Sequence, residues 1–262
     1  MQVIIDAQPV YIATGGKEFD PALPSVVFIH GTGQDHTIWV LPTRYFARHQ
    51  RNVLAIDLPG HGRSGGEPLA SIEAMADWIV KLLDATGIHS AALVGHSMGS
   101  LVAISLAAND ADRVRAIALI GTAVPMPVSD ALLNSAKENS PDAIDMLTLW
   151  GHSSSAHLGG NATPGMWMLG SGRRLMERAA PGVIFADLNA CNQHQQGLED
   201  AAAITCQTLL ILGQSDQLTP PRKARALADA ISGSKTVVLD KSGHAMLSEC
   251  PEQVLDQLTS IV

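Results

Sequence analysis

Residues 91–106, AALVGHSMGSLVAISL, decide the fold of this chain. The opening AALV is an apolar run of the length of a buried strand, and the second half continues as a helix. Between them, GHSMG at 95–99 matches the G-x-S-x-G pattern, in which a serine stands on a sharp turn from strand to helix. The turn is so tight that only small residues fit beside the serine, which gives Gly95 and Gly99 a steric reason. The stretch therefore predicts a nucleophile, Ser97, at the N-terminus of a helix whose dipole favours developing negative charge.

Short apolar runs like AALV recur along the chain. Residues 71–86 form the clearest helix between them, because Ser71 can cap its N-terminus and Gly87 can end it. A further helix is expected over His36–His49. Strands that alternate with amphipathic helices are typical of a mostly parallel, twisted α/β sheet, here of about eight strands, with helices on both faces. The expected strands are Val3–Ile5, Pro9–Ala13, 25–30, 52–57, 91–94, 114–121, 208–213 and 236–240.

The alternation of strands and helices breaks in the second half of the chain. One long stretch mixes Pro, Gly, Ser, Asn and Met, as in SSSAHLGGNATPG at 153–165, and contains no strand-like run. It is predicted to be a helical cap, or lid, inserted after the sixth strand and lying over the active edge of the sheet. The predicted domains are therefore an α/β core of residues 1–124 and 199–262 and a cap of residues 125–198.

A serine hydroxyl is a weak nucleophile unless a base takes its proton, and the base needs a carboxylate to orient it. Asp216 follows the apolar run TLLILG, and His244 follows TVVLD. Both stand at the carboxyl ends of predicted strands, on the edge that carries Ser97, where open α/β sheets place their sites. Asp240 also ends a strand, but it lies so close to His244 in the chain that a local turn suits it better. The predicted catalytic residues are Ser97, Asp216 and His244.

These motifs resemble the α/β-hydrolase superfamily, and the likeness covers nearly the whole chain. HGTG at 30–33 resembles the family's oxyanion segment after the third strand, and DLPGHGRS at 57–64 resembles its DxPGxGxS turn after the fourth. GHSMG, together with GQSDQLTP at 213–220 and SGHAMLSECPEQV at 242–254, resembles the elbow, acid and histidine regions. The cap stands where the family inserts its lid. The chain is thus similar to serine esterases and lactonases that carry a helical cap.

The resemblance implies an oxyanion hole built from the backbone N–H groups of Thr32 and Met98, with Gly33 in place of Thr32 if the loop turns one residue later. We expect hydrolysis of a carboxylic ester, or a related acyl substrate, through an acyl-enzyme on Ser97. An enol-lactonase or a carbon–carbon bond hydrolase of dienoic diketones would use the same triad. A hydrolase-like ligand sensor is the alternative from a different class.

The predicted cap is rich in apolar and sulfur-containing side chains, which are expected to form its core and part of a substrate pocket. Trp150, Trp167 and Met168 are the candidate substrate-binding residues. Arg173 and Arg174 could bind a substrate carboxylate, although such a pair is more often a solvated helix face. The cap is therefore expected to decide which substrate is accepted.

Several polar residues near the triad are expected to have supporting roles. His30, His61 and His96 should brace loops through hydrogen bonds, with the ring of His96 pointing away from Ser97. Glu249 should support the histidine loop or cap the helix that follows it.

Composition and charge exclude several classes of function. The chain has 262 residues with 25 acidic and 17 basic side chains, a net charge of −8, so nucleic acid is not an expected partner. Its three widely spaced cysteines suit a reducing compartment, and no signal peptide is visible. No apolar run approaches the roughly 20 residues of a membrane span. We therefore expect a cytoplasmic enzyme that takes a small-molecule substrate and needs neither metal nor cofactor, in an oligomeric state that the sequence leaves open.

Overall fold

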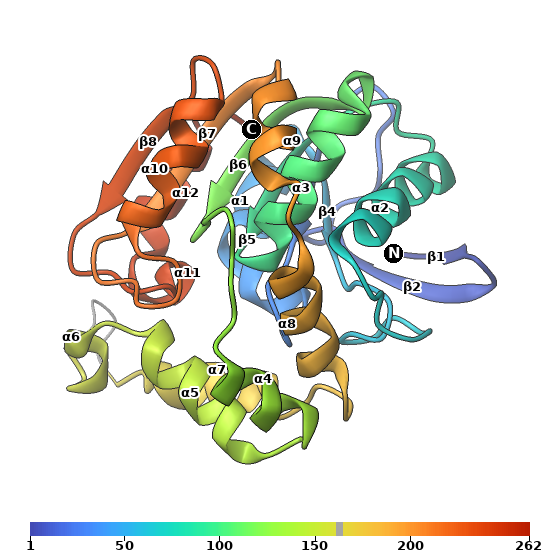
Figure 1. The fold of residues 1–262 in the computed structure, drawn as a ribbon. Coiled ribbons are helices and arrows are strands. Elements are labelled where there is room, and N and C mark those ends of the chain that lie inside the picture. The colour runs from blue at the N-terminus through green and yellow to red at the C-terminus, as the bar shows by residue number, and fades with distance from the viewer. Residues whose placement is uncertain (161–164) are drawn as a thin grey trace.

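The computed structural model describes residues 1–160 and 165–262, and its centre is an eight-stranded sheet (Figure 1). The strand order is β1-β2-β4-β3-β5-β6-β7-β8. β1 pairs with β2 and β2 with β4 in antiparallel fashion, and every other pair is parallel. The mostly parallel α/β fold is therefore confirmed. The strands are β1 (Gln2–Ile5), β2 (Gln8–Ala13), β3 (Ser25–Ile29), β4 (Asn52–Ile56), β5 (Ala91–His96), β6 (Val114–Ile120), β7 (Gln207–Gly213) and β8 (Lys235–Leu239).

The central strands are buried on both faces, which explains why their sequences are continuous apolar runs. Every residue of β3, β4 and β5 is buried. One face of the sheet packs against α1 (Val40–Arg48), α11 (Met246–Glu249) and α12 (Pro251–Leu258). The other packs against α2 (Ile72–Thr86), α3 (Met98–Asn109), α9 (Gly197–Ala203) and α10 (Pro221–Ala230). Two short 3₁₀ helices cover His36–Trp39 and Ala111–Arg113.

The local signals for helix ends behave as the sequence predicts. The side chain of Ser71 accepts a hydrogen bond from the N–H of Ala74, and Gly87 ends α2 in the left-handed conformation with φ 69°. The helix expected over His36–His49 forms as the first 3₁₀ turn followed directly by α1. In the described part of the chain, no helix combines the length and the apolar character that crossing a membrane requires.

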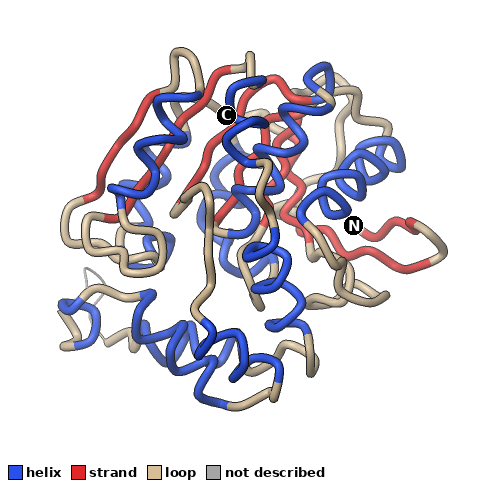
Figure 2. Tube along the Cα trace, in the orientation of Figure 1, coloured by secondary structure: helices blue, strands red, loops and turns tan. Residues whose placement is uncertain are grey.

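Of the described helices between β6 and β7, the first five lie together beyond the carboxyl ends of the parallel strands (Figure 1). They are α4 (Asp130–Lys137), α5 (Pro141–Gly151), α6 (Ser154–His157), α7 (Met168–Met176) and α8 (Val183–Gln193). Figure 2 shows helices and loops but no strand among the described residues of this region, which we call the cap. The part of the 153–165 stretch at 161–164 lies outside the described residues. The domain boundaries at residues 125 and 198 stay a prediction.

Candidate active site

Ser97 stands in the turn between β5 and α3, where its backbone adopts φ 52° and ψ −117°. A positive φ strains a residue that carries a side chain, at a cost of about 1–3 kcal/mol. The two glycines make the turn possible. A Cβ on Gly95 would overlap the carbonyl group of Gly99, and a Cβ on Gly99 would overlap the carbonyl oxygen of Ile29. The N–H of Ser97 donates to the carbonyl oxygen of Ile120 at 2.9 Å, so β6 helps to hold the strained turn.

Asp216 and His244 meet at the same edge of the sheet, since they follow the neighbouring parallel strands β7 and β8. Nδ1 of His244 donates to Oδ2 of Asp216 at 2.8 Å. The buried carboxylate also accepts from the N–H groups of Leu218 and Thr219 and from the Thr219 hydroxyl. Burial by itself raises the pKa of Asp216, but the neighbouring His244 and these hydrogen bonds hold that pKa below its usual range. Asp216 is therefore ionised and fixes the ring of His244.

Thr219 is a site residue that the sequence motifs do not identify. Its hydroxyl lies 2.7 Å from Oδ2 of Asp216 and 3.1 Å from Nδ1 of His244. The available signal is a threonine three residues after the aspartate, where the chain turns and a short side chain can bond back to the carboxylate. Asp240, the alternative acid, is exposed, and none of the hydrogen bonds in the described ranges joins it to His244. The structure therefore places Asp216 and not Asp240 beside the histidine.

His96 lies against His244 of the predicted triad, whereas the sequence predicts a ring that only braces its loop and points away from Ser97. The two ring centroids are 4.8 Å apart, and Nε2 of His96 donates to the carbonyl oxygen of His244 at 3.0 Å. β5 ends at His96 and the chain turns sharply at Ser97, so the alternation of side chains along a strand no longer decides the direction of this ring. The bracing role itself is observed, and His30 and His61 also make hydrogen bonds within their loops.

Glu249 supports the histidine loop, which is one of the two roles expected for it. Its Oε1 accepts from the N–H of Gly243 at 3.0 Å, and its Oε2 accepts from the N–H of Ser153 at 3.1 Å. The residue after His244 also donates its N–H to the carbonyl oxygen of Gly151 at 2.8 Å. Because Gly151 ends α5, the loop that carries His244 is tied directly to the cap.

The two predicted oxyanion donors have available N–H groups. Met98 is the first residue of α3, where backbone N–H groups have no partner inside the helix. Among the hydrogen bonds of the described residues, none is donated by the backbone N–H of Thr32 or Met98. The N–H of Gly33, the substitute for Thr32, donates to Oδ2 of Asp187 at 2.8 Å. The geometry therefore favours Thr32 over Gly33.

A cavity of about 720 Å³ opens above these groups, and Thr32, Ser97 and His244 all contribute to its wall. Trp150 and Met168, two of the predicted substrate-binding residues, also line it. Trp167 does not, and this corrects the prediction for that residue: its side chain is 72% exposed. Trp167 directly precedes α7, and the next residue, Met168, takes the inward direction and is buried.

The cavity wall is largely apolar, but it is not neutral. Its charged members are Arg174, Arg178 and Lys223. No Asp or Glu of the described residues lines it. Arg173, the other arginine suggested by the sequence, lies outside the wall and pairs with Asp145 and Glu177. The cavity is therefore more positive than the acidic chain as a whole.

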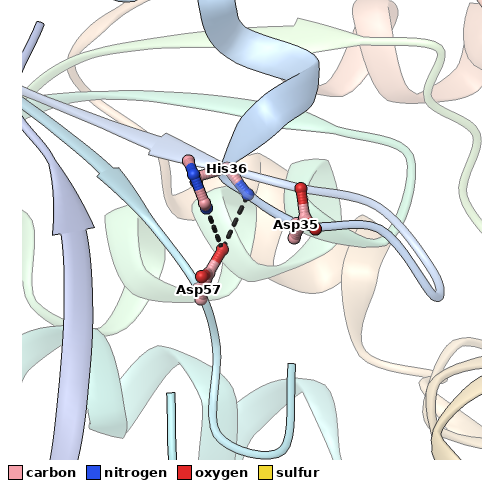
Figure 3. Close-up of side chains that lie close together, drawn as sticks. All are labelled: Asp35, His36 and Asp57. Carbon is pink, nitrogen blue, oxygen red and sulfur yellow. Dashed lines mark hydrogen bonds and ion pairs between the residues drawn. The ribbon is translucent and has the colours of Figure 1, made fainter. Parts of the chain in front are cut away.

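Asp35, His36 and Asp57 form a separate polar cluster, in which possible ligand atoms lie within 4.8 Å of one another (Figure 3). Oδ1 of Asp57 accepts from the backbone N–H of His36 at 2.7 Å and faces its Nδ1 at 2.8 Å. Asp35 caps the following turn by accepting from Thr37 and pairs with Arg178 at 2.7 Å. Burial by itself raises the pKa of Asp57, but the hydrogen bonds from His36 outweigh this effect. The pKa of Asp57 is therefore below its usual range. We interpret the cluster as a brace for the loop after β3.

A parallel sheet with a serine on the turn after β5 and a hydrogen-bonded Asp–His pair at the same edge defines the class of α/β hydrolases. The chain belongs to the alpha/beta hydrolase family, whose model matches residues 26–257. It is 31% identical over 245 residues to a pimeloyl-[acyl-carrier protein] methyl ester esterase of Neisseria meningitidis serogroup B, covering 87% of this chain and 89% of that protein. The protein is therefore a hydrolase.

Two further relatives show the range of the family. An (E)-2-((N-methylformamido)methylene)succinate hydrolase of Acinetobacter baylyi is 24% identical over 240 residues, covering 87% of this chain and 86% of its own. The solved structure of the enol-lactonase from Burkholderia xenovorans LB400 superposes with a TM-score of 0.86 at 22% identity, covering 99% of this chain and 98% of that one. The structural likeness supports the shared fold.

Proposed function

We propose that the protein is a serine esterase that hydrolyses a carboxylic ester through an acyl-enzyme, with Ser97, His244 and Asp216 as its catalytic triad. The observation that carries the proposal is the hydrogen bond between Asp216 and His244, together with the strained Ser97, which lines the same cavity as His244. The methyl ester esterase of Neisseria meningitidis, at 31% identity, supports an ester as the substrate class.

The catalytic role of each residue follows from the hydrogen bonds that its side chain already makes. Nδ1 of His244 is bound to Asp216, so Nε2 is the ring nitrogen left to accept the proton of Ser97. The serine oxygen attacks the ester carbonyl, and the N–H groups of Thr32 and Met98 stabilise the oxyanion that forms. The imidazolium then returns its proton to the leaving alcohol. Water attacks the acyl-enzyme with His244 again as base, which frees the acid and restores Ser97.

The test is turnover of p-nitrophenyl esters from acetate to decanoate by the wild-type protein and by Ser97→Ala. The wild type should turn over at about 1–10³ s⁻¹, and the substitution should lower kcat on the order of 10⁶-fold. The chain length with the highest kcat/KM measures the acyl pocket. A wild type as inactive as Ser97→Ala would refute the esterase proposal, and tight binding with turnover below about one per minute would favour a ligand sensor.

A second candidate is hydrolysis of a substrate that carries its own carboxylate, as an enol-lactonase or a carbon–carbon bond hydrolase of dienoic diketones would perform. It is favoured by the three cationic side chains in the cavity wall, to which no Asp or Glu of the described residues contributes. The succinate hydrolase of Acinetobacter baylyi supports a carboxylate-bearing substrate. Arg174 pairs with Glu177 and Arg178 with Asp35, whereas Lys223 has no ion pair among the described residues.

This candidate is tested by comparing a neutral aryl ester with the matching ester that ends in a carboxylate. If the anionic end is recognised, Lys223→Gln should raise KM for the carboxylate ester several-fold and leave KM for the neutral ester unchanged. Equal effects on both esters would assign Lys223 no part in charge recognition.

A further inference from the structure

Asp187 is a cap residue whose side chain is completely buried against the core. It lies on α8, and its carboxylate is 0% exposed. One oxygen, Oδ2, accepts from the N–H of Gly33 at 2.8 Å and lies 2.9 Å from Nε2 of His61. Gly33 belongs to the loop after β3 and His61 to the turn after β4. A single carboxylate oxygen thus joins the cap to two core loops.

The hydrogen bonds around His61 require a proton on each ring nitrogen. Nδ1 lies 2.9 Å from the carbonyl oxygen of Pro59, which can only accept, and Nε2 faces the carboxylate of Asp187. Burial by itself lowers the pKa of His61, but Asp187 and these hydrogen bonds raise the pKa above its usual value. A buried carboxylate is costly unless a hydrogen-bonded cation accompanies it, and His61 is that cation.

The same helix holds the loop after β3 at a second point, one turn further along. Cys191 lines the same cavity wall as Thr32, and its thiol faces the Thr32 side chain. Ile184 packs against the neighbouring glycine: a Cβ on Gly33 would lie 2.8 Å from its Cγ1. Ile184, Asp187 and Cys191 share one face of α8, because they are three and four residues apart. This face therefore holds the peptide group between Thr32 and Gly33, directly after the proposed oxyanion donor.

We propose that Asp187 is a positioning residue for the oxyanion hole: its carboxylate, paired with His61, clamps the loop of Thr32 and Gly33 and so couples the cap to acyl transfer. The inference rests on the proposed function, because it assigns the N–H of Thr32 to the oxyanion. A displaced donor harms the transition state more than the ground state, since the negative charge develops only as the serine attacks.

Asp187→Asn keeps the size of the side chain and an acceptor for Gly33, and removes the charge that holds His61. On the best p-nitrophenyl ester we expect kcat to fall about 10–100-fold, below the 10²–10³-fold loss typical of deleting a whole donor, with KM changed less than about threefold. Affinity for a trifluoromethyl ketone, which forms an oxyanion adduct with a serine nucleophile, should fall by the same factor as kcat/KM.

The matched control is Asp145→Asn, which removes a carboxylate of α5 that pairs with Arg173 within the cap. It should leave kcat, KM and inhibitor affinity within about twofold of the wild type. His61→Gln should reproduce the loss seen in Asp187→Asn, and the double variant should add little, because both changes remove the same interaction. If kcat, KM and the melting temperature all fell together, and did so in Asp145→Asn as well, the cause would be a general loss of protein stability. That result would refute the assignment.

Hydrogen exchange of the peptide that contains residues 30–34 separates this inference from the esterase proposal. If the wild type hydrolyses no ester, the proposed function fails, and faster exchange of this loop in Asp187→Asn still decides whether the clamp exists. Unchanged exchange, or kcat within twofold of the wild type, would overturn the inference. If Asp187→Asn does not fold, His61→Gln with the same assays gives the decision.

Discussion

The sheet edge and the cap differ in how their residues are packed and hydrogen-bonded. Ser97 and Asp216 follow strands whose residues are almost all buried, and His244 follows the edge strand β8. Each of the three is held by hydrogen bonds to neighbouring strands or turns. The cap has a small core of its own, in which Leu132, Ala136, Ala143 and Leu188 are the fully buried members. The side chains that the cap contributes to the cavity range from buried, as in Met168, to exposed, as in Arg174. The sheet therefore positions the chemistry, and the lightly packed cap shapes the space around it.

Polar contacts connect these two regions at the points that matter for catalysis. Glu249 and the backbone of Gly151 hold the histidine loop, whereas Asp187 holds the oxyanion loop. Each contact is buried and directional, so it fixes orientation more than it adds stability. Changes at the sheet edge should accordingly abolish catalysis, and changes in the cap wall should mainly alter substrate choice.

After the loss of Ser97 itself, the largest effect is expected at the same sheet edge, from Asp216→Asn. The substitution keeps the shape of the side chain, but its amide can no longer stabilise the imidazolium form of His244 or hold the tautomer in which Nδ1 carries the proton. We expect kcat for p-nitrophenyl esters to fall about 10⁴-fold with KM little changed. Asp240→Asn is the matched control and should have wild-type kcat, because Asp240 is exposed. Equal losses in both variants would mean that the acid is misassigned.

How far sequence predicts this molecule differs between the same two regions. The strands and the Asp216–His244 pairing were predictable because short apolar runs and G-x-S-x-G obey local rules of burial and turn geometry. The direction of the His96 ring and the contact between Thr219 and His244 were not, because they depend on how separate turns meet. The exposure of Trp167 depends on where α7 begins, and the pairing of Asp187 with His61 joins residues far apart in the chain. Neither leaves a pattern in the sequence.

The second effect is a change of stability with pH, and it concerns His30 and His61. Their ring centroids are 4.8 Å apart; His30 braces the core, and His61 holds the cap. His30 donates from Nδ1 to Gly31 and accepts at Nε2 from the N–H of Leu58, so it is neutral. Burial lowers its pKa to about 4. Between about pH 6.5 and pH 4 the unfolded chain binds the proton and the folded chain does not. The free energy of unfolding should therefore drop by up to about 3 kcal/mol as the pH falls through this window.

Urea unfolding at a series of pH values measures this drop. His30→Asn should flatten the slope of stability against pH below 6.5 by close to one proton, and His89→Asn, at an exposed histidine, should not. His61 works in the opposite direction: its pKa is raised, so the stability it contributes is present at low pH and is lost as the pH rises through its folded pKa. A wild-type slope in His30→Asn would show that another group takes up the proton.

The smallest effect is expected in the cap wall and distinguishes two tryptophans. Trp150 lines the cavity, so Trp150→Ala should enlarge it, lower kcat/KM for the best short ester about tenfold, and move the preference toward longer acyl chains. Trp167 lies outside the wall and is 72% exposed, so Trp167→Ala should leave the chain-length profile as it is. Labelling of Ser97 by a small fluorophosphonate should proceed at the wild-type rate in both variants, because neither change reaches the sheet edge. A shift in profile for Trp167→Ala would mean that the cap closes over substrate in a way that brings this side chain inward, and the cap would then shape the site by moving as well as by packing.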